Sequence, residues 1–316
     1  MKKVLYILIG IYFSVQTYGQ NFPGPVGDVS TTAVFKDDQR VDYWLEDSVV
    51  IQRGYVDISD PSLGYVTYGD VEFALGESDP NVISLGDGGT ATYVLSNSIS
   101  DQEGFDFAVF ENAFDDYFLE LAFVEVSTDG INYVRFVNQS NTDTDSQTGA
   151  FGATYTENVN NLAGKYKAQY GTPFDLSELV DSLDIDISNI NFIRIIDVVG
   201  SVNSQHASLD SYGNIINDPW PTPFNSSGFD LDGLAILKPV ELSINEVDNS
   251  ITYNNNVLSI KESSLVSKIQ VYDLTGKLVF VKDVKNNLDL DILSRGIYVL
   301  KVNNSISSFN MKINVK

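Results

Sequence analysis

The stretch GFDFAVFENAFDDYFLELAFVEVSTDG, residues 104–130, contains two apolar segments on either side of an acidic turn. In the first segment, Phe105–Phe110, residues of both parities are apolar, a pattern typical of a strand that is covered on both faces. The second segment, Leu119–Val126, is largely apolar on both parities, and Thr128-Asp129-Gly130 after it favours a hairpin turn. We therefore predict a buried antiparallel pair of strands at the centre of a β-sandwich.

Four acidic residues lie in or beside these two segments, namely Asp106, Glu111, Glu120 and Glu125. Carboxylates are rarely buried unless they are paired with a partner or bound to a metal. An all-apolar core does not account for them, and the stretch therefore points to ion pairing or to a cation site.

Short apolar runs continue through the rest of residues 20–240, separated by Gly, Asn, Asp and Pro. The runs include Val71–Leu75, Ala91–Leu95, Val134–Val137, Phe192–Val199 and Leu234–Leu237. Many short strands with turn signals between them indicate an antiparallel sandwich, with a jelly roll as the expected form. A short helical turn is expected near Asp175, where Asp175 or Ser177 would act as the N-cap.

The N-terminus has the three parts of a secretory signal peptide. Lys2 and Lys3 precede an apolar segment, Val4–Val15, and Thr17-Tyr18-Gly19 follows it. We predict a signal peptide over residues 1–19. The apolar run is shorter than the roughly 20 residues of a membrane-spanning helix, which disfavours a membrane anchor, and no later stretch is suited to span a bilayer as a helix. The chain has no cysteine, so neither a lipid-modified cysteine nor a disulfide framework is available.

The charge is distributed unevenly along the chain. Residues 20–244 contain 8 Lys and Arg against 36 Asp and Glu, whereas residues 245–316 contain 9 against 7. A body with that excess of negative charge repels phosphate backbones, so nucleic acid is a poor partner and multivalent cations are better ones. Acidic surfaces also keep exported proteins soluble, and that explanation serves for most of these carboxylates.

The last 76 residues, 241–316, have a rhythm of short strands that predicts a small immunoglobulin-like β-sandwich. Three segments, Ile269–Val279, Leu293–Val302 and Met311–Lys316, resemble in sequence and order the type A C-terminal sorting domain of the type IX secretion system of Bacteroidetes. That resemblance implies export across the outer membrane by the type IX machinery, followed by surface attachment or release. It implies nothing about the role of the body.

The body resembles, less specifically, the carbohydrate-binding and discoidin-like sandwiches known as galactose-binding-like. The resemblance lies in Ser84–Gly89, Phe192–Asp197 and Ser227–Leu234, and it implies a structural calcium site formed in part by an Asp-x-Asp at the start of the last strand. Here that pair is Asp230 and Asp232, which share the parity of apolar residues farther along the strand.

Inward carboxylates need a cation or hydrogen-bond donors, and Ca²⁺ takes 6 to 8 oxygen ligands of this kind. We therefore predict a structural Ca²⁺ site formed by Asp106, Glu111, Asp230 and Asp232, provided that their strands meet. The alternative is that Asp230 and Asp232 lie at a solvated strand end.

The segment His206–Phe229 is the best candidate for a recognition loop. It combines Tyr212, Trp220 and Phe224 with amide and carboxylate side chains on a backbone stiffened by prolines. Rigid aromatic rings beside such polar groups suit the faces and hydroxyl groups of sugars, so these three residues are the predicted ligand contacts. The alternative is a long loop whose aromatic rings pack over the edge of the sandwich.

Catalytic motifs are weak in this sequence. His206 is the only histidine, which excludes a zinc site of several histidines, and no nucleophile-elbow motif accompanies it. The leading hypothesis is a secreted or surface-displayed, non-catalytic protein of a Gram-negative bacterium that binds a glycan or another nutrient ligand. A polysaccharide hydrolase with paired carboxylates and a structural adhesin remain as alternatives.

Overall fold

A computed structural model describes residues 22–239, 251–254, 256–260, 267–273, 276–285, 287–303 and 308–315. The contacts divide the chain into two compact units, with the boundary between Pro239 and Val240. The first unit contains the body and the second contains the tail, and each is described by itself. The predicted signal peptide lies outside the described residues. In the described parts, no helix is long and apolar enough to cross a membrane.

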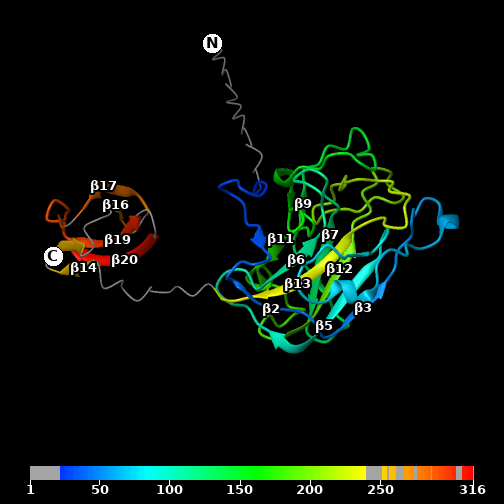
Figure 1. The fold of residues 1–316 in the computed structure, drawn as a ribbon, viewed down its shortest axis with the longest axis horizontal. Coiled ribbons are helices and arrows are strands. Elements are labelled where there is room, and N and C mark those ends of the chain that lie inside the picture. Colours follow the sequence, from blue (N-terminus) through cyan, green and yellow to red (C-terminus); the bar gives the residue numbers. More distant parts are fainter. Residues whose placement is uncertain are drawn as a thin grey trace, which may run out of the picture. The chain divides into compact units, whose positions relative to one another are not determined.

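The body is an all-β sandwich, as the sequence predicts, and all its strand pairs are antiparallel (Figure 1). The first sheet has the order β1-β11-β6-β13-β2, and β4 also pairs with β13. Its strands are β1 (Val34–Phe35), β11 (Tyr170–Phe174), β6 (Phe107–Glu111), β13 (Asp230–Leu237), β2 (Val41–Trp44) and β4 (Ile83–Ser84).

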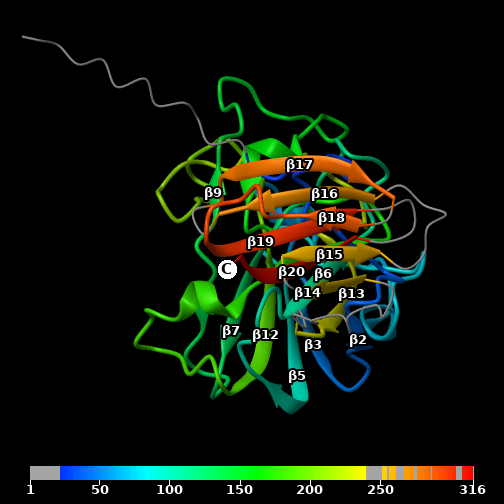
Figure 2. The same ribbon diagram turned by 90° about the vertical axis from the view of Figure 1, so that its left-hand side faces the viewer.

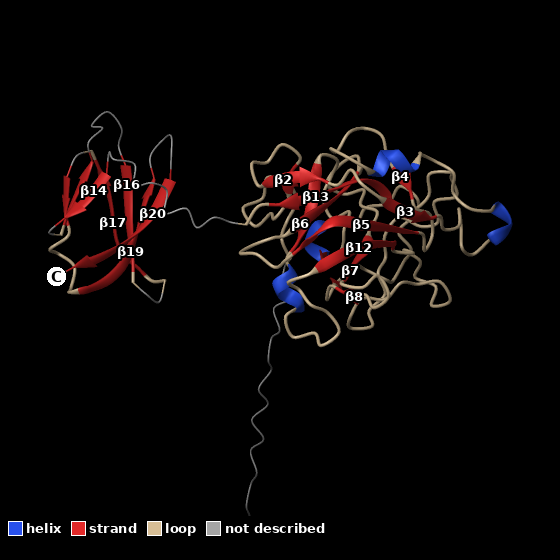
Figure 3. Cartoon of the chain, turned by 90° about the horizontal axis from the view of Figure 1, so that it is seen from below, coloured by secondary structure: helices blue, strands red, loops and turns tan. Residues whose placement is uncertain are grey.

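The second sheet has the order β3-β5-β12-β7-β8. Its strands are β3 (Val49–Gln52), β5 (Thr90–Ile99), β12 (Ile190–Asp197), β7 (Ala122–Ser127) and β8 (Val134–Arg135). A separate ladder joins β9 (Gln139–Ser140) to β10 (Val159–Asn160). Helical structure in the body is limited to short 3-10 turns (Figure 3), which are η1 (Pro61–Leu63), η2 (Val71–Ala74), η3 (Thr156–Asn158) and η4 (Leu176–Leu179).

Two local predictions are wrong. Residues 71–75, expected as a strand, begin with the 3-10 turn η2. More importantly, β6 and β7 do not pair with each other. Strand β6 pairs with β11 and β13, whereas β7 pairs with β12 and β8 in the other sheet. The ten residues between β6 and β7 cross from one sheet to the other, because β6 takes both partners from later parts of the chain, whereas β7 pairs with the adjacent β8 and with β12.

The core between the sheets explains why β6 is apolar on both faces. Phe107 and Val109 pack in the main core, whereas Ala108 and Phe110 belong to a second cluster with Trp44. Burying one such side chain stabilises the fold by roughly 2–3 kcal/mol. The prediction that β6 is covered on both sides is therefore confirmed, and β6 is fixed in position on both faces.

The described part of the tail forms two antiparallel sheets of its own, with the orders β14-β15-β18 and β17-β16-β19-β20 (Figure 2). The strands are β14 (Ile251–Asn254), β15 (Val257–Ile260), β16 (Ser267–Tyr272), β17 (Leu278–Val284), β18 (Asn287–Asp289), β19 (Gly296–Asn303) and β20 (Ser308–Val315). Leu258, Ile269 and Leu300 are buried in a core that is separate from that of the body. This arrangement agrees with the predicted small sandwich.

Candidate functional site

Three long loops meet at one end of the body sandwich (Figure 1), and we call this surface the loop face. It consists of residues 112–121, 141–158 and 198–229. The amide of Thr154 donates to the carbonyl of Tyr117 at 2.7 Å, and the amide of Trp220 donates to the carbonyl of Thr148 at 3.0 Å. The amide of Leu121 donates to the Asp218 carboxylate at 2.9 Å. These bonds join each loop to at least one other, so the loop face is one connected surface.

Four phenylalanines form a continuous row across the loop face. The ring centroids of Phe114 and Phe118 are 5.5 Å apart, those of Phe118 and Phe151 6.4 Å, and those of Phe151 and Phe224 5.9 Å. Phe114 and Phe151 expose 80% and 78% of their surface, and Phe224 is also exposed. Apolar side chains that gather at an exposed surface indicate a place of contact with another molecule. We call this set the phenylalanine row.

A small polar pocket adjoins the phenylalanine row, and its volume is about 130 Å³. The segment that carries Phe151 also supplies Thr154 and Tyr155 to the pocket, and the Tyr155 ring lies 5.6 Å from that of Tyr117. The full lining is Thr142, Asp143, Thr148, Ala153, Thr154, Tyr155, Asn158 and Asn217. The buried hydroxyl of Thr154 has no hydrogen-bond partner among the described residues. A buried polar group without a partner is costly, so a polar group that reached this hydroxyl would be favoured.

The three predicted ligand residues have different surroundings. Phe224 belongs to the phenylalanine row. Tyr212 is 66% exposed, and in the described part of the chain no ring contact joins it to the other two. The Trp220 indole is half-buried, donates to the Asp87 carboxylate at 2.9 Å and stacks on His206 at 6.5 Å. Sequence analysis did not identify Phe114, Phe118 and Phe151 as candidate ligand contacts. The available signal was that acidic residues follow Phe114 and that glycines lie close to Phe151, as is common in exposed loops.

Beneath the loop face lies a set of six acidic side chains, which we call the carboxylate group. Five of them are almost inaccessible to solvent. The group consists of Glu111 at the end of β6, Asp197 at the end of β12, Asp230 at the start of β13, Asp87 after β4, and Glu120 and Asp218 from the loops. Strand ends and loops from both sheets therefore direct negative charge into one region.

Close backbone approaches position two members of the carboxylate group. Gly164 has φ +78°, and a Cβ there would lie 1.9 Å from the carbonyl oxygen of Glu120. A Cβ at Gly200 would lie 1.7 Å from Asp218 Oδ1. Only glycine leaves room at such positions. The backbone at Glu120 and the side chain of Asp218 are therefore held in place by packing against glycine.

Hydrogen bonds satisfy several of these carboxylates. Asp197 accepts from the amides of Gly88 at 2.9 Å and Phe229 at 2.7 Å. Asp87 accepts from the amide of Ile58 at 2.8 Å in addition to the Trp220 indole. Glu111 accepts from the amide of Ala113 at 2.8 Å, and Asp230 accepts from the Ser84 hydroxyl.

Burial raises the pKa values throughout the carboxylate group. The pKa values of Glu111, Glu120, Asp197 and Asp218 all lie well above their ordinary values, first because of burial. Neighbouring acids raise them further, and for Asp218 the hydrogen bond from the Leu121 amide opposes the rise. Burial also raises the pKa of Asp230 to about 6, against the opposing effects of the Ser84 hydroxyl and the Arg53 charge. A low-dielectric region disfavours the charged form, and neighbouring negative charges disfavour it further.

The four residues predicted to bind calcium divide into two places. Leu231 is opposite Glu111 in the ladder of β6 and β13, which brings Glu111 close to Asp230. Asp232 is buried nearby and accepts from the Ser78 hydroxyl and the Asp79 amide. Asp106 precedes the other end of β6, where its carbonyl accepts from the amide of Leu237. Five residues of strand span roughly 17 Å, so Asp106 does not share one ion with Glu111.

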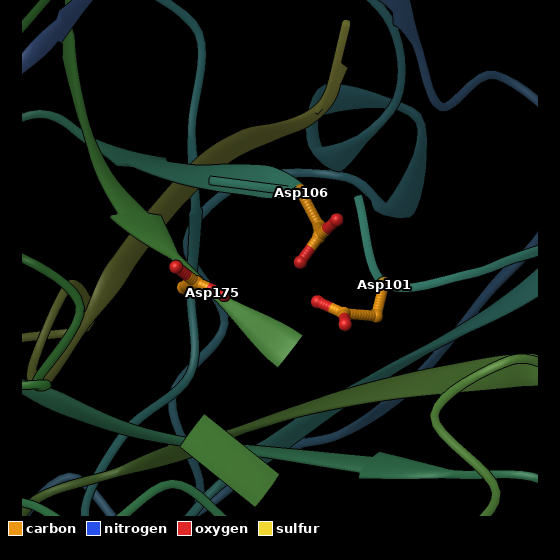
Figure 4. A group of neighbouring side chains, drawn as sticks. All are labelled: Asp101, Asp106 and Asp175. Carbon is orange, nitrogen blue, oxygen red and sulfur yellow. The ribbon is translucent and has the colours of Figure 1, made fainter. Parts of the chain in front are cut away.

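Asp106 instead lies beside Asp101 and Asp175, whose carboxylates point toward it (Figure 4). One oxygen of each lies within 4.8 Å of the others, and no other such set of three is found in the described part of the chain. Both oxygens of Asp106 already accept backbone amides, from Gln102 at 2.9 Å and Leu176 at 2.7 Å. Asp175 caps η4, as the sequence predicts. These hydrogen bonds give Asp106 and Asp175 a structural role, because they hold the backbone beside β6 and at the start of η4.

Glu125 has the partners that Glu120 lacks. It is opposite both Arg194 and Arg135 in the ladders of β7. Arg135 Nε lies 2.9 Å from one carboxylate oxygen, and Arg194 Nε lies 2.9 Å from the other. Two guanidinium groups therefore neutralise and orient this buried acid.

Comparison with known proteins identifies the tail. A family model described as a secretion system C-terminal sorting domain matches residues 251–316. No curated protein matches the chain.

Solved structures similar to the chain include the β-glucuronidases of Dictyoglomus thermophilum (12% identity, TM-score 0.24, 86% of this chain and 43% of that one), Parabacteroides merdae (12%, 0.24, 86% and 35%) and Ruminococcus gnavus (10%, 0.21, 88% and 47%). The chain spans less than half the length of these enzymes, and likeness at this level carries no argument about the body. Residues 251–316 are thus a C-terminal sorting domain of the type IX secretion system, and the protein is secreted or displayed at the outer cell surface.

Proposed function

We propose that the body is a non-catalytic domain that binds a neutral glycan through the loop face after export. The observation that carries this proposal is the phenylalanine row beside a polar pocket that contains an unpartnered hydroxyl. Exposed rings suit the apolar faces of sugars, and the pocket offers hydroxyl and amide groups to sugar hydroxyls.

The charge of the loop face favours a neutral ligand over an anionic one. Asp115 and Asp116 follow directly after Phe114, and Asp143 lines the pocket. Lys167 pairs with Asp116 at 2.9 Å, so one of these charges is compensated. The remaining carboxylates repel uronic acids and sulfated sugars, because like charges brought together cost free energy.

Burial of the carboxylate group argues against the hydrolase alternative. Glu111 exposes 2% of its surface and Glu120 exposes 8%. A glycosidase places its two carboxylates on either side of the scissile bond, where the substrate must reach them. A polysaccharide lying on the loop face would not reach these acids.

Binding of soluble polysaccharides to the purified full chain tests the proposal. We expect neutral polysaccharides to retard the protein in affinity electrophoresis, and Phe151→Ala/Phe224→Ala to weaken binding at least tenfold, which corresponds to about 1.4 kcal/mol. Leu183→Ala removes a fully exposed apolar side chain outside the loop face and serves as the matched control. Thr154→Val tests the pocket separately.

Three results would contradict the proposal. Release of reducing ends from the polysaccharide would favour the hydrolase. Retention of anionic polysaccharides alone would contradict the charge argument. No binding to any polysaccharide, with the protein folded, would leave the adhesin as the better explanation.

A further inference from the structure

The polar pocket beside the phenylalanine row is too small for a whole small-molecule ligand. Its volume of about 130 Å³ compares with the roughly 300–1,000 Å³ of sites that enclose such a ligand. The space is nevertheless large enough for several water molecules. A pocket of this size therefore suits one substituent of a larger molecule that lies on the loop face.

Hydrogen bonds from one buried amide hold the wall of the pocket in place. Asn217 is 2% exposed, and its side-chain carbonyl accepts from the Thr148 amide at 2.9 Å and from the Gln147 side chain at 3.0 Å. Its NH₂ group donates to the carbonyls of Asp143 at 2.5 Å and Ser146 at 2.8 Å. These four bonds use both donors and both acceptor positions of the amide. The pocket is thus formed before a ligand arrives, which lowers the cost of binding.

Other polar groups of the pocket are not used by the fold. Thr154 is 2% exposed, and its hydroxyl has no partner among the described residues. One oxygen of the exposed Asp143 carboxylate accepts from the Asp145 amide at 2.9 Å, and in the described part of the chain the other oxygen accepts from no protein group. The pocket therefore offers a buried hydroxyl and, at its exposed side, a hydrogen-bond acceptor.

An apolar wall lies beside these polar groups. Ala153 and Tyr155 line the pocket on either side of Thr154 in the sequence. The Tyr155 ring packs edge-on against Tyr117 at 5.6 Å, and the amide of Thr154 donates to the Tyr117 carbonyl at 2.7 Å. This contact and this bond fix the wall relative to the unpartnered hydroxyl.

On the premise that the loop face binds a neutral glycan, we propose that the pocket takes the acetamido group of a 2-acetamido-2-deoxyhexose residue. The acetyl carbonyl accepts from the Thr154 hydroxyl, the amide N–H donates to the Asp143 carboxylate, and the methyl group lies against Ala153 and Tyr155. A plain hexose has a hydroxyl in place of the acetamido group, so it brings neither the carbonyl nor the methyl group. An acetamido group is also uncharged, which suits a pocket that contains Asp143.

Calorimetric titration of the purified full chain with three tetrasaccharides tests this inference at pH 6. The first is tetra-N-acetylchitotetraose, the second is cellotetraose, which has hydroxyl groups in place of the acetamido groups, and the third is the deacetylated chitotetraose, which has positively charged amines. We expect the acetylated tetramer to bind at least tenfold more tightly than cellotetraose, because it pairs a buried hydroxyl and buries a methyl group. The deacetylated tetramer is expected to bind more weakly than the acetylated one.

Matched variants locate the acetamido group. Thr154→Val keeps the shape of the side chain and removes the hydroxyl, so we expect the preference for the acetylated tetramer to fall below threefold. Its thermal midpoint should not fall, because the hydroxyl has no protein partner to lose. Thr154→Ser retains the hydroxyl and should retain the preference, as should Leu183→Ala outside the loop face.

Three results would overturn the inference. Equal affinity for the acetylated tetramer and cellotetraose, or a preference that Thr154→Val leaves intact, would show that the pocket does not read the acetamido group. Tighter binding of the deacetylated tetramer would show that attraction between opposite charges decides. In all three cases neutral glycans still bind, so the proposed function stands. If no neutral glycan binds at all, the proposed function fails and this inference fails with it.

Discussion

Glu120 and Glu125 lie five residues apart and are almost equally buried, at 8% and 7% exposure, yet their surroundings are opposite. Glu125 is on β7, where two neighbouring strands place Arg135 and Arg194 directly opposite it. Glu120 is in the preceding loop and faces other acids. Burial alone therefore does not distinguish an acid that is held by cations from one that faces other acids. The charge of the residues that face the acid does.

The same contrast separates two ways in which the body uses negative charge. Around Glu125, Arg135 also lies 4.0 Å from the Phe123 ring, and Arg194 lies 3.6 Å from the Tyr133 ring. Each guanidinium thus joins an acid to an aromatic side chain, and the cluster fastens three strands. Among the described residues, Glu120 has no such network.

The largest effect is expected at Glu125. Replacing it in Glu125→Gln leaves two guanidinium groups without their shared partner. Breaking a buried pair costs about 3–5 kcal/mol, and since both arginines are about one-third exposed, we expect a loss of about 2–4 kcal/mol. Urea unfolding of the full chain measures this loss. A neutral result would remove the distinction between the two acids.

The pH dependence of stability is the next largest effect. The pKa of Asp230 is raised by burial to about 6, and those of Glu111 and Glu120 are raised well above their ordinary values. The folded state therefore binds more protons than the unfolded state above about pH 4, and stability falls as pH rises. In chelator we expect the free energy of unfolding to drop by about 1–2 kcal/mol between pH 5 and pH 7.

A pH series in chelator, measured by urea unfolding at each pH, checks that expectation. The window stops at pH 7 because Lys165 is buried and its pKa is lowered to about 7, so it acts in the opposite direction above this point. Stability that rises from pH 5 to pH 7 in chelator would show that the carboxylate group does not control the titration.

A smaller effect of opposite sign is expected at Glu120. Without divalent ions, Glu120→Gln removes a charge that has no donor, and we expect the free energy of unfolding at pH 7.5 to rise by about 1 kcal/mol. The measurement is urea unfolding in chelator beside Glu125→Gln. A loss as large as that of Glu125→Gln would mean that Glu120 has a structural partner, and the comparison would fail.

The smallest effect concerns the surface above the carboxylate group. Phe151→Ala removes a ring that is 78% exposed, and we expect the free energy of unfolding to change by no more than about 0.5 kcal/mol. The same variant is expected to weaken glycan binding. A loss of several kcal/mol would show that the phenylalanine row packs as part of the fold.

The sequence pattern predicted structure correctly where residues adjacent in the chain decide the environment of a side chain. The double-faced apolar pattern of Phe105–Phe110 predicted a strand covered on both sides, and Asp175 caps the turn expected there. Phe151 escaped notice because its exposure depends on loops that come from three parts of the chain. Asp106 and Glu111 are separate because they lie at opposite ends of β6, whereas the register of β6 and β13, which no local pattern specifies, brings Glu111 close to Asp230.

The sequence by itself determined the all-β class, the acidic body and the sorting tail, because alternation, composition and motif order are local properties. Only the tertiary structure decided which acids meet. The antiparallel ladders bring Arg135 and Arg194 to Glu125, and the strand ends bring Asp230 and Glu111 to Glu120. The physical reason is that the partner of a buried charge is set by pairing between distant segments, and this pairing is fixed only when the two sheets close on their common core.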